Sequence, residues 1–436
     1  GGIDPADIVA VGITNQRETS VIWDRETGRP ARKAIVWQCR RSADICRELK
    51  ERGHQEQFHR KTGLLLDPYF SGTKLSWVME HEPEIARRAE RGELAFGTVD
   101  SWLLYRMTGG RCHATDASNA SRTLLFNLHD LSWDAELADI LGVPLSMLPE
   151  VRDSSGTFGV TDPDAFLGIE APVAGIAGDQ QAALFGQACF QAGMTKNTYG
   201  TGSFVLMNIG EKPVLSQRGL LTTVAWSMDG RVTYALEGSI FVTGAAINWL
   251  RDGLGIIQEA REMEPLARSV ESSEGVYFVP AFVGLGAPYW DPSARALMIG
   301  MTRGTGRGHI ARAVIESMAL QTADIIGLMT EETGIPIREL RVDGGASVMD
   351  LLLEYQADLL GVPVVRPVVK ETTSLGAALL AGLAVGFWKD LEEISSTWEA
   401  DRRVDPRPER RQEMETLRKG WRRAVERCLG WLEEGC

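Results

Sequence analysis

The sequence lacks the motifs of several large enzyme classes. Its 436 residues contain no G-x-x-x-x-G-K-[ST] loop, no H-E-x-x-H pair, no G-x-S-x-G turn and no H-R-D loop. These absences argue against P-loop nucleoside triphosphatases, zinc proteases, α/β-hydrolases and protein kinases. Only six histidines occur, and none have the spacing of zinc ligands. We therefore assign no residue as a metal ligand.

Cysteine is scarce, and long hydrophobic runs are absent. The six cysteines form no C-x-x-C pair and are too few for a disulfide framework in a chain of this length. The longest apolar run, residues 373–388, contains three glycines and is too short to span a bilayer. We therefore expect a cytoplasmic protein that does not insert into membranes.

Positive charge is in deficit. The chain has 46 Lys and Arg against 59 Asp and Glu, a formal net charge of -13. Such a surface repels phosphate backbones, so we expect no nucleic-acid partner. A nucleotide site would need local help from Mg²⁺, helix N-termini and individual arginines.

What the sequence does contain is a mixture of strand and helix patterns in two successive halves. In the first half we expect strands at 8–14, 20–24, 34–37 and 172–178, and helices at 42–52, 73–91 and 179–189. In the second we expect strands at 195–199, 203–209, 220–227, 232–236, 340–342 and 363–366, and helices at 310–332, 349–360, 374–385 and 408–433. This order predicts two α/β domains, residues 1–187 and 188–436, with a ligand cleft between them.

Two polar segments follow strand patterns in the first half. In Asn15-Gln16-Arg17-Glu18, Arg17 donates in a planar fork and Glu18 accepts, so the pair could hold neighbouring hydroxyls of a polyol. Adjacent strand side chains point to opposite faces, so this requires a bend. A polar strand end in solvent explains the segment equally well. In the second segment, Asp179 follows Gly178 at a helix start, where it is either an N-cap or a carboxylate that accepts a proton from an alcohol.

Glycine-rich turns in the second half are candidates for phosphate contact. Gly200-Thr201-Gly202 separates two strands, and Gly344-Gly345 joins a strand to a helix. Glycines let backbone N–H groups approach phosphate oxygens, although simple hairpins and turns are the commoner explanation. Three aromatics, Trp37, Tyr69 and Phe204, lie near one or another of these candidate segments. Most aromatics belong to the core, but against the carbon face of a small polyol these would add apolar contact.

Taken together, these segments resemble the glycerol kinases of the FGGY carbohydrate kinase family, over about residues 8–388. The matching segments are Ile13-Thr14-Asn15-Gln16-Arg17-Glu18, Ala34-Ile35-Val36-Trp37-Gln38-Cys39-Arg40-Arg41, Asp67-Pro68-Tyr69-Phe70-Ser71-Gly72-Thr73-Lys74, Phe96-Gly97-Thr98-Val99-Asp100, Asn119-Ala120-Ser121-Arg122-Thr123, Gly178-Asp179-Gln180-Gln181, Asn197-Thr198-Tyr199-Gly200-Thr201-Gly202 and Gly284-Leu285-Gly286-Ala287-Pro288-Tyr289-Trp290-Asp291. The related xylulose and gluconate kinases typically differ at the Asn-Gln-Arg-Glu segment.

The resemblance implies a fold, a reaction and a site. The fold would be two tandem ribonuclease-H-like, actin-like domains. The reaction would be phosphorylation of glycerol to glycerol 3-phosphate, with ATP and Mg²⁺ and in a dimer or tetramer. It also implies a role for each matching residue: Asp179 as catalytic base, Arg17, Glu18, Trp37, Tyr69, Asp179, Gln180 and Phe204 as the glycerol pocket, and Thr201, Gly244, Asn248 and Gly345 as nucleotide contacts.

Three departures from the family pattern bear on these expectations. Asn248 stands where the family often has Gln or Asn, and Met349 where it often has Asn. Met349 cannot donate a hydrogen bond, so we expect altered adenine contacts. The Asp-x-Gly-Thr-Thr-Ser hairpin with which family members begin, and which contacts phosphates, is not in this sequence. We therefore expect an unpaired sheet edge in the first domain. A kinase for another polyol or sugar, and an inactive protein that only binds ligand, remain alternatives.

Overall fold

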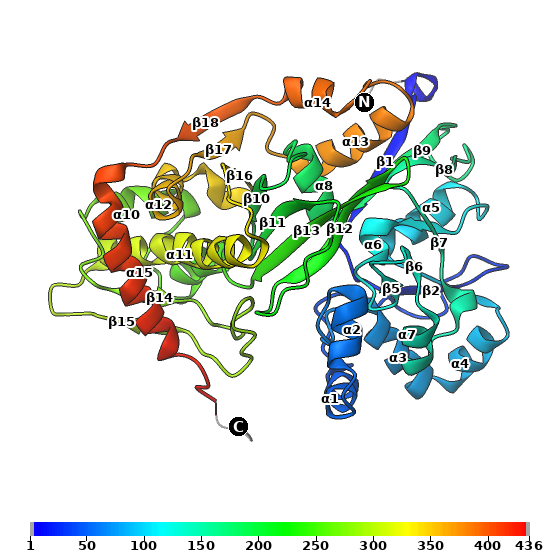
Figure 1. The fold of residues 1–436 in the computed structure, drawn as a ribbon, viewed down its shortest axis with the longest axis horizontal. Coiled ribbons are helices and arrows are strands. Elements are labelled where there is room, and N and C mark those ends of the chain that lie inside the picture. The colour runs from blue at the N-terminus through cyan, green and yellow to red at the C-terminus, as the bar shows by residue number, and fades with distance from the viewer. Residues whose placement is uncertain (1–3, 433–436) are drawn as a thin grey trace.

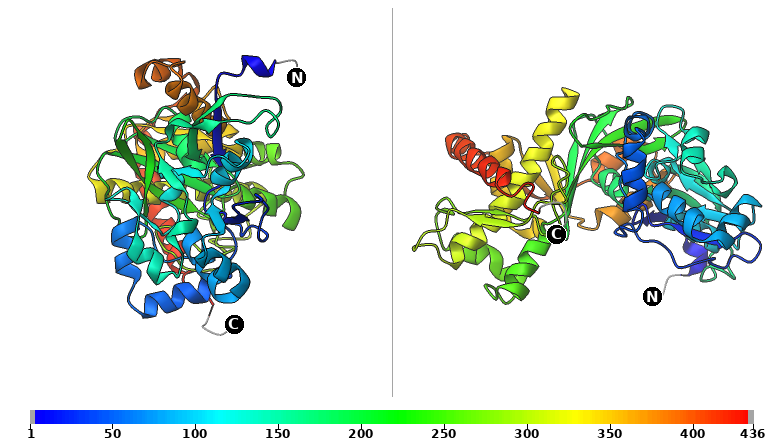
Figure 2. Two further views of the ribbon diagram at one scale, coloured as in Figure 1. Left: turned by 90° about the vertical axis from the view of Figure 1, so that its right-hand side faces the viewer. Right: turned by 90° about the horizontal axis from the view of Figure 1, so that it is seen from below.

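The computed structural model describes residues 4–432, which form two lobes built on mixed α/β elements (Figure 1). The first lobe contains β1 (Val11–Asn15), β2 (Val21–Asp24), α1 (Ala43–Glu51), α2 (Gln55–Thr62), α3 (Ser71–His81), α4 (Pro83–Glu90), β3 (Leu94–Gly97), α5 (Val99–Met107), β4 (Ala114–Asp116), α6 (Ala117–Ala120), β5 (Phe126–Asn127), β6 (Ser132–Trp133), α7 (Ala135–Ile140), β7 (Glu150–Arg152), β8 (Ser155–Val160), β9 (Pro172–Gly178) and α8 (Asp179–Gly186). Seen from below, the two lobes lie apart at their outer ends and meet in the middle (Figure 2).

The second half of the chain builds the larger sheet. It contains β10 (Thr195–Tyr199), β11 (Ser203–Gly210), β12 (Leu221–Met228), β13 (Arg231–Ile240), α9 (Gly244–Asn248), α10 (Met263–Arg268), β14 (Tyr277–Val279), β15 (Leu297–Ile299), α11 (Arg307–Thr333), β16 (Leu340–Asp343), α12 (Asp350–Leu360), β17 (Val364–Pro367), α13 (Thr372–Ala384), α14 (Leu391–Thr397), β18 (Ala400–Val404) and α15 (Arg411–Glu426). No helix among residues 4–432 has the length and apolar character needed to cross a membrane.

Strand pairing brings the polar segments and the glycine turns to strand ends. One sheet has the order β1-β9-β8, and the other has the order β12-β13-β11-β10-β16-β17-β18. β1 and β9 are parallel, with Asn15 opposite Gly178, so the residues that follow both strands emerge side by side. β10 and β16 are also parallel and end with Thr198 opposite Asp343. Among the described residues β1 is an edge strand, as expected.

Most predicted elements are present, but two predictions are wrong. Residues 34–37 do not form a strand: Ile35 pairs only with Ser20, and the Cys39 N–H then closes a turn on the Val36 carbonyl. The helix expected at 73–91 is two helices, α3 and α4, because Pro83 cannot continue a helix and instead starts the second one. The last helix is also shorter than expected: α15 ends at Glu426, and residues 433–436 lie outside the described part of the chain.

Helix α13 ties the two halves together through backbone contacts. It packs on α8, β9 and β1, which all belong to the first half of the chain. A β-carbon at Gly376 would lie 1.8 Å from the Ala182 carbonyl oxygen, and one at Gly186 would lie 2.0 Å from the Thr372 oxygen. Only glycine allows helices to approach this closely. Because Asp179 begins α8, this contact fixes the position of its carboxylate.

Candidate functional site

A bend at the end of β1 turns two polar side chains into one cluster. Glu18 has φ +60°, in the left-handed region, and the Thr19 N–H donates to the Arg17 carbonyl across it at 2.7 Å. Glu18 Oε1 consequently lies 3.8 Å from Arg17 Nε, and both side chains are buried. The bend that the sequence required for Arg17 and Glu18 to reach one ligand is therefore present.

Asp179 stands beside Arg17 at the start of α8. Its Oδ1 lies 3.3 Å from Arg17 Nε and accepts from the Gln180 N–H at 2.8 Å. The N-cap of α8 is Gly178, so the interpretation of Asp179 as a helix cap is wrong. One third of the Asp179 side chain is exposed. Burial raises the pKa of this carboxyl above its ordinary value, although Arg17 and Lys196 oppose the rise.

A buried lysine holds the neighbouring amide. Lys196, on β10, donates to Gln180 Oε1 and, at 2.9 Å, to Thr198 Oγ1. Its side chain is fully buried, and burial lowers the pKa of the ammonium group to about 8. No pattern in the sequence singles out Lys196. This contact fixes the amide of Gln180 next to Asp179.

The three aromatic residues lie beside this cluster. The rings of Trp37 and Tyr69 meet edge to face, with centroids 5.7 Å apart. The Phe204 ring lies 5.8 Å from the Arg17 guanidinium carbon. Burial raises the pKa of Tyr69 far above that of a free phenol, so its hydroxyl remains protonated. The arrangement offers apolar faces on one side and donors and acceptors on the other.

Two charged residues without an assigned role complete the cluster. Arg122 Nε donates to Glu18 Oε1 at 2.8 Å, and its Nη2 donates to Glu237 Oε1 at 2.9 Å. Glu237 also accepts both Nη groups of Arg17, one of them at 3.1 Å. Burial opposes ionisation of Glu237, but Arg122 and Arg17 outweigh it and lower its pKa to about 2. Glu237 is the one acidic residue of β13 and directly follows the apolar pair Ala235-Leu236, which is the sequence signal that could have identified it.

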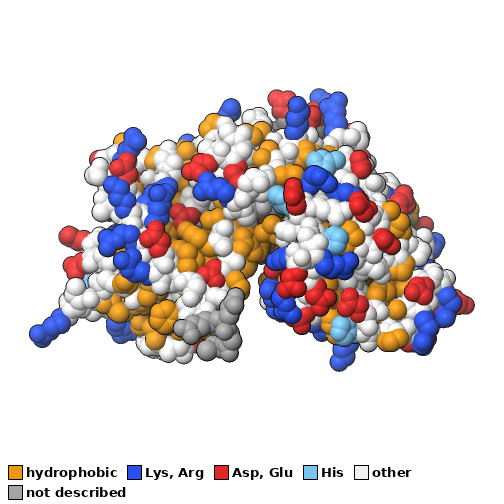
Figure 3. Space-filling view, turned by 60° about the horizontal axis from the view of Figure 1, so that its bottom comes forward, with side chains coloured by type: hydrophobic (Ala, Val, Ile, Leu, Met, Phe, Trp, Pro, Cys, Tyr) orange, Lys and Arg blue, Asp and Glu red, His pale blue; other side chains and the backbone are white. Residues whose placement is uncertain are grey.

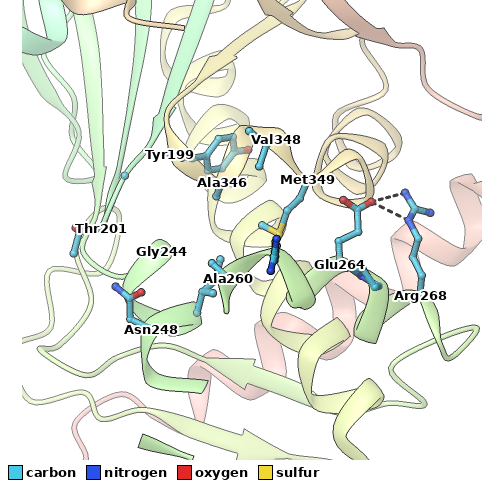
Figure 4. A pocket seen from close by; sticks show the side chains of 15 residues that line it. Tyr199, Thr201, Gly244, Asn248, Ala260, Glu264, Arg268, Ala346, Val348 and Met349 are labelled. Carbon is cyan, nitrogen blue, oxygen red and sulfur yellow. Dashed lines mark hydrogen bonds and ion pairs between the residues drawn. The ribbon is translucent and has the colours of Figure 1, made fainter. Parts of the chain in front are cut away.

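A separate cavity of about 750 Å³ lies beyond the ends of β10 and β16 (Figure 4). All four predicted nucleotide contacts line it, together with Met349: Thr201, Gly244, Asn248 and Gly345. Its volume is in the range of cofactor sites. The Gly344 backbone has φ +82° and packs against Tyr199, where a β-carbon would lie 2.5 Å from the Tyr199 oxygen. Each of the two glycine turns contributes a residue to the wall of this cavity, Gly200 from one and Gly345 from the other.

Met349 precedes α12 at the N-cap position without capping the helix, and another residue supplies the cap. Met349 makes no side-chain capping hydrogen bond. Instead Glu264 of α10 accepts from the N–H groups of Asp350 and Leu351, at 3.1 and 2.8 Å. Figure 4 shows Glu264 paired with Arg268 and the Met349 side chain extending toward Ala260. The carboxylate is thus occupied by the helix end.

The part of the chain described here offers no cage for a metal ion. Residues 4–432 contain no group of three or more His, Cys, Asp or Glu side chains placed to hold one. Mg²⁺ does not need such a cage, because it usually binds one or two carboxylates together with substrate phosphates and water. Asp179 Oδ1 is engaged, whereas its Oδ2 makes no hydrogen bond within these residues.

The space-filling view shows a notch between the two lobes, with hydrophobic side chains gathered on its inner wall (Figure 3).

Two family models match two successive parts of the chain. The N-terminal domain of the FGGY family of carbohydrate kinases matches residues 1–186, and the C-terminal domain of that family matches residues 195–385.

Curated proteins and solved structures agree with these matches. The chain is 60% identical over 430 residues to glycerol kinase 2 of Thermotoga maritima, covering 99% of this chain and 86% of the relative. It is 59% identical over 433 residues to a glycerol kinase of Caldanaerobacter subterraneus, covering 99% and 87%. The structure of Plasmodium falciparum glycerol kinase with ADP matches with a TM-score of 0.91, 38% identity and coverage of 97% of this chain and 84% of that one. A xylulose kinase from Lactobacillus acidophilus, with a TM-score of 0.86, 23% identity and coverage of 95% and 83%, shares the fold.

Proposed function

This chain belongs to the FGGY family of carbohydrate kinases, and from that premise we propose that it transfers the γ-phosphoryl group of ATP to a terminal hydroxyl of glycerol. The products are glycerol 3-phosphate and ADP. The observation that carries the proposal is the placement of Asp179 beside Arg17, with its carboxylate one third exposed. Close relatives named glycerol kinase and a matching structure with ADP support both substrates.

In this proposal the polar cluster holds glycerol and the aromatic rings exclude water. Arg17 donates to one hydroxyl and Glu18 accepts from another, while Tyr69 and Gln180 supply further hydrogen bonds. Trp37 and Phe204 pack against the carbon chain. Asp179 accepts the proton of the attacking hydroxyl as the phosphoryl group arrives. Most of the rate enhancement in such transfers comes from positioning and charge neutralisation.

The nucleotide would occupy the 750 Å³ cavity, with Thr201, Gly244, Asn248 and Gly345 as contacts. Mg²⁺ would enter on the ATP phosphates, and Asp179 would meet it only through water, because its free Oδ2 is needed to accept the hydroxyl proton. The ion would neutralise charge on the phosphates.

We also propose a domain boundary between residues 187 and 188 and a location in the cytoplasm. Assembly into dimers or tetramers stays a prediction.

A substrate panel tests the proposed reaction. ADP production should depend on glycerol and should be much weaker with xylulose or gluconate, because Trp37, Tyr69 and Phe204 narrow the pocket. Rates at several concentrations of each substrate, with ATP and Mg²⁺ held constant, give the comparison. A higher kcat/KM for xylulose or gluconate would favour the kinase of another polyol or sugar. Glycerol binding without turnover by any substrate would favour a protein that only binds ligand.

Replacing Met349 tests the proposed contacts with the nucleotide. We expect Met349→Asn to lower the KM for ATP by roughly 2- to 10-fold, the value of one added hydrogen bond, because Asn can donate or accept where the thioether cannot. The KM for glycerol should not change, since Met349 lines only the other cavity. Steady-state kinetics with each substrate varied in turn measure both constants. An unchanged or higher KM for ATP would show that residue 349 does not contact the base.

A further inference from the structure

Four charged side chains are packed together beneath the proposed glycerol pocket. Arg17, Glu18, Arg122 and Glu237 are each at most 1% exposed in their side chains. Buried ion pairs generally contribute little to the free energy of folding, because the cost of removing two charges from water can exceed the attraction between them. Moreover, Arg122 Nη1 is buried and has no hydrogen-bond partner among residues 4–432. A buried charge cluster that stability alone does not explain, and that contains two proposed substrate residues, suggests a role in the site.

Glu237 fixes the plane of the Arg17 guanidinium. It accepts both Nη groups of Arg17, in the fork geometry that carboxylates and arginines favour. Because guanidinium is planar and rigid, holding its two ends also sets the direction of the Nε edge. That edge faces Asp179, 3.3 Å away. Glu237 therefore sets the orientation of Arg17 toward the reacting groups by holding its two Nη groups.

Arg122 restrains the carboxylate of Glu18 in a similar way. It bridges the two carboxylates, donating through Nε to Glu18 and through Nη2 to Glu237. Glu18 has a left-handed backbone at the end of β1, where no strand partner holds its side chain. Arg122 supplies that support and restrains one carboxylate oxygen. The other Glu18 oxygen makes no hydrogen bond within the described residues, which leaves it available to a ligand.

The support comes from the other sheet and is rigid. Glu237 lies in the middle of β13, paired with Leu206 of β11 on one side and Leu221 of β12 on the other. Arg17 follows β1 of the smaller sheet, 220 residues earlier in the chain. The pair therefore spans the two sheets, and a strand held on both sides makes a firm backing for a site.

On the basis of the proposed function, we propose that Glu237 and Arg122 are positioning residues, which orient Arg17 and Glu18 for glycerol without touching it. Removing the charge of Glu237 leaves Arg17 held by Gln181, whose Oε1 accepts from Nη1 at 3.2 Å, and by Asp179, its nearest remaining carboxylate partner. Glycerol then loses a correctly oriented donor, and the existing ion pair between Arg17 and the proposed base becomes stronger in the free enzyme. Binding of ATP in its separate cavity should be unaffected.

Calorimetric glycerol binding and steady-state kinetics of Glu237→Gln test this role. We expect the Kd and KM for glycerol to rise by about 10- to 100-fold, because removing the charge of one partner of a buried pair weakens the orientation of the other. The KM for ATP should stay the same. Tyr234→Phe is the matched control: Tyr234 lies on the same strand, and its hydroxyl donates to the Leu128 carbonyl at 2.7 Å, away from the cluster. This variant should bind glycerol like the unmodified protein.

A double-mutant cycle separates positioning from general damage. Once Arg17 is removed by Arg17→Ala, Glu237 has nothing left to orient, so adding Glu237→Gln should weaken glycerol binding little further. Full additivity, or a Glu237→Gln variant that binds glycerol normally, would overturn the proposal. Should Glu237→Gln not fold, Glu237→Asp keeps the charge but withdraws it by one methylene, and the same cycle applies. If the unmodified protein and Tyr234→Phe neither bind nor phosphorylate glycerol, the proposed function fails instead.

Discussion

Asp179→Asn is expected to lower kcat for glycerol phosphorylation by about 10²–10⁴-fold, the usual contribution of a positioned general base. The amide has the same shape and can still accept the Gln180 N–H, so glycerol should bind with little change. It cannot accept the hydroxyl proton. Titration calorimetry of glycerol and a coupled assay of ADP production would measure the two effects separately.

The pH dependence of kcat provides a second test of the role of Asp179. The pKa of Asp179 is raised, chiefly by burial, so kcat should fall toward acid pH at a higher pH than an exposed aspartate would give. Above that pKa the carboxylate is ionised and can accept a proton; below it the group is protonated and inactive. This acid limb should be absent in the residual activity of Asp179→Asn. Near-normal turnover by the variant would show that Asp179 is not the base.

Gly376→Ala is expected to lower the free energy of unfolding by about 3 kcal/mol, near the upper end for overpacked sites. The new β-carbon would lie 1.8 Å from the Ala182 carbonyl oxygen, so α8 and α13 must separate. Because α8 carries Asp179 at its first residue, turnover of the folded variant should also fall. Urea unfolding and kcat measured on the same preparation would test both effects.

Gly327→Ala is the control for this substitution. Gly327 lies inside α11, and a β-carbon there meets no atom within 4 Å. Alanine should therefore stabilise the protein by about 0.5–1 kcal/mol through the helix backbone alone. If Gly376→Ala behaved like Gly327→Ala, the close contact between α8 and α13 would not be a feature of the protein in solution.

Local patterns identify the parts of the site that follow strands. Residues 172–178 were expected as a strand and form β9 with the same bounds, and the polar residues after β1 and β9 meet because parallel strands end at the same edge. The glycine turns after β10 and β16 meet for the same reason. In each case the sequence needs only a strand and the residues that follow it.

The supporting residues could not be predicted in this way. Glu237 meets Arg17 across 220 residues and Arg122 across 115, and no periodicity encodes such a contact. Lys196 lies in a strand whose pattern gives no hint that its ammonium group reaches Gln180. The division of residues 73–91 into two helices had a local signal, Pro83, whereas the failed strand at 34–37 depended on a pairing partner that only the fold supplies.

The most direct test of the central claim is ³¹P nuclear magnetic resonance of a reaction containing this chain, ATP, Mg²⁺ and glycerol. We predict that the γ-phosphate signal of ATP is replaced by that of glycerol 3-phosphate, in equal amount to the ADP formed, and that neither product forms with Asp179→Asn on the same timescale. Formation of ADP with inorganic phosphate and no glycerol 3-phosphate, or glycerol 3-phosphate formed equally fast by Asp179→Asn, would contradict the account.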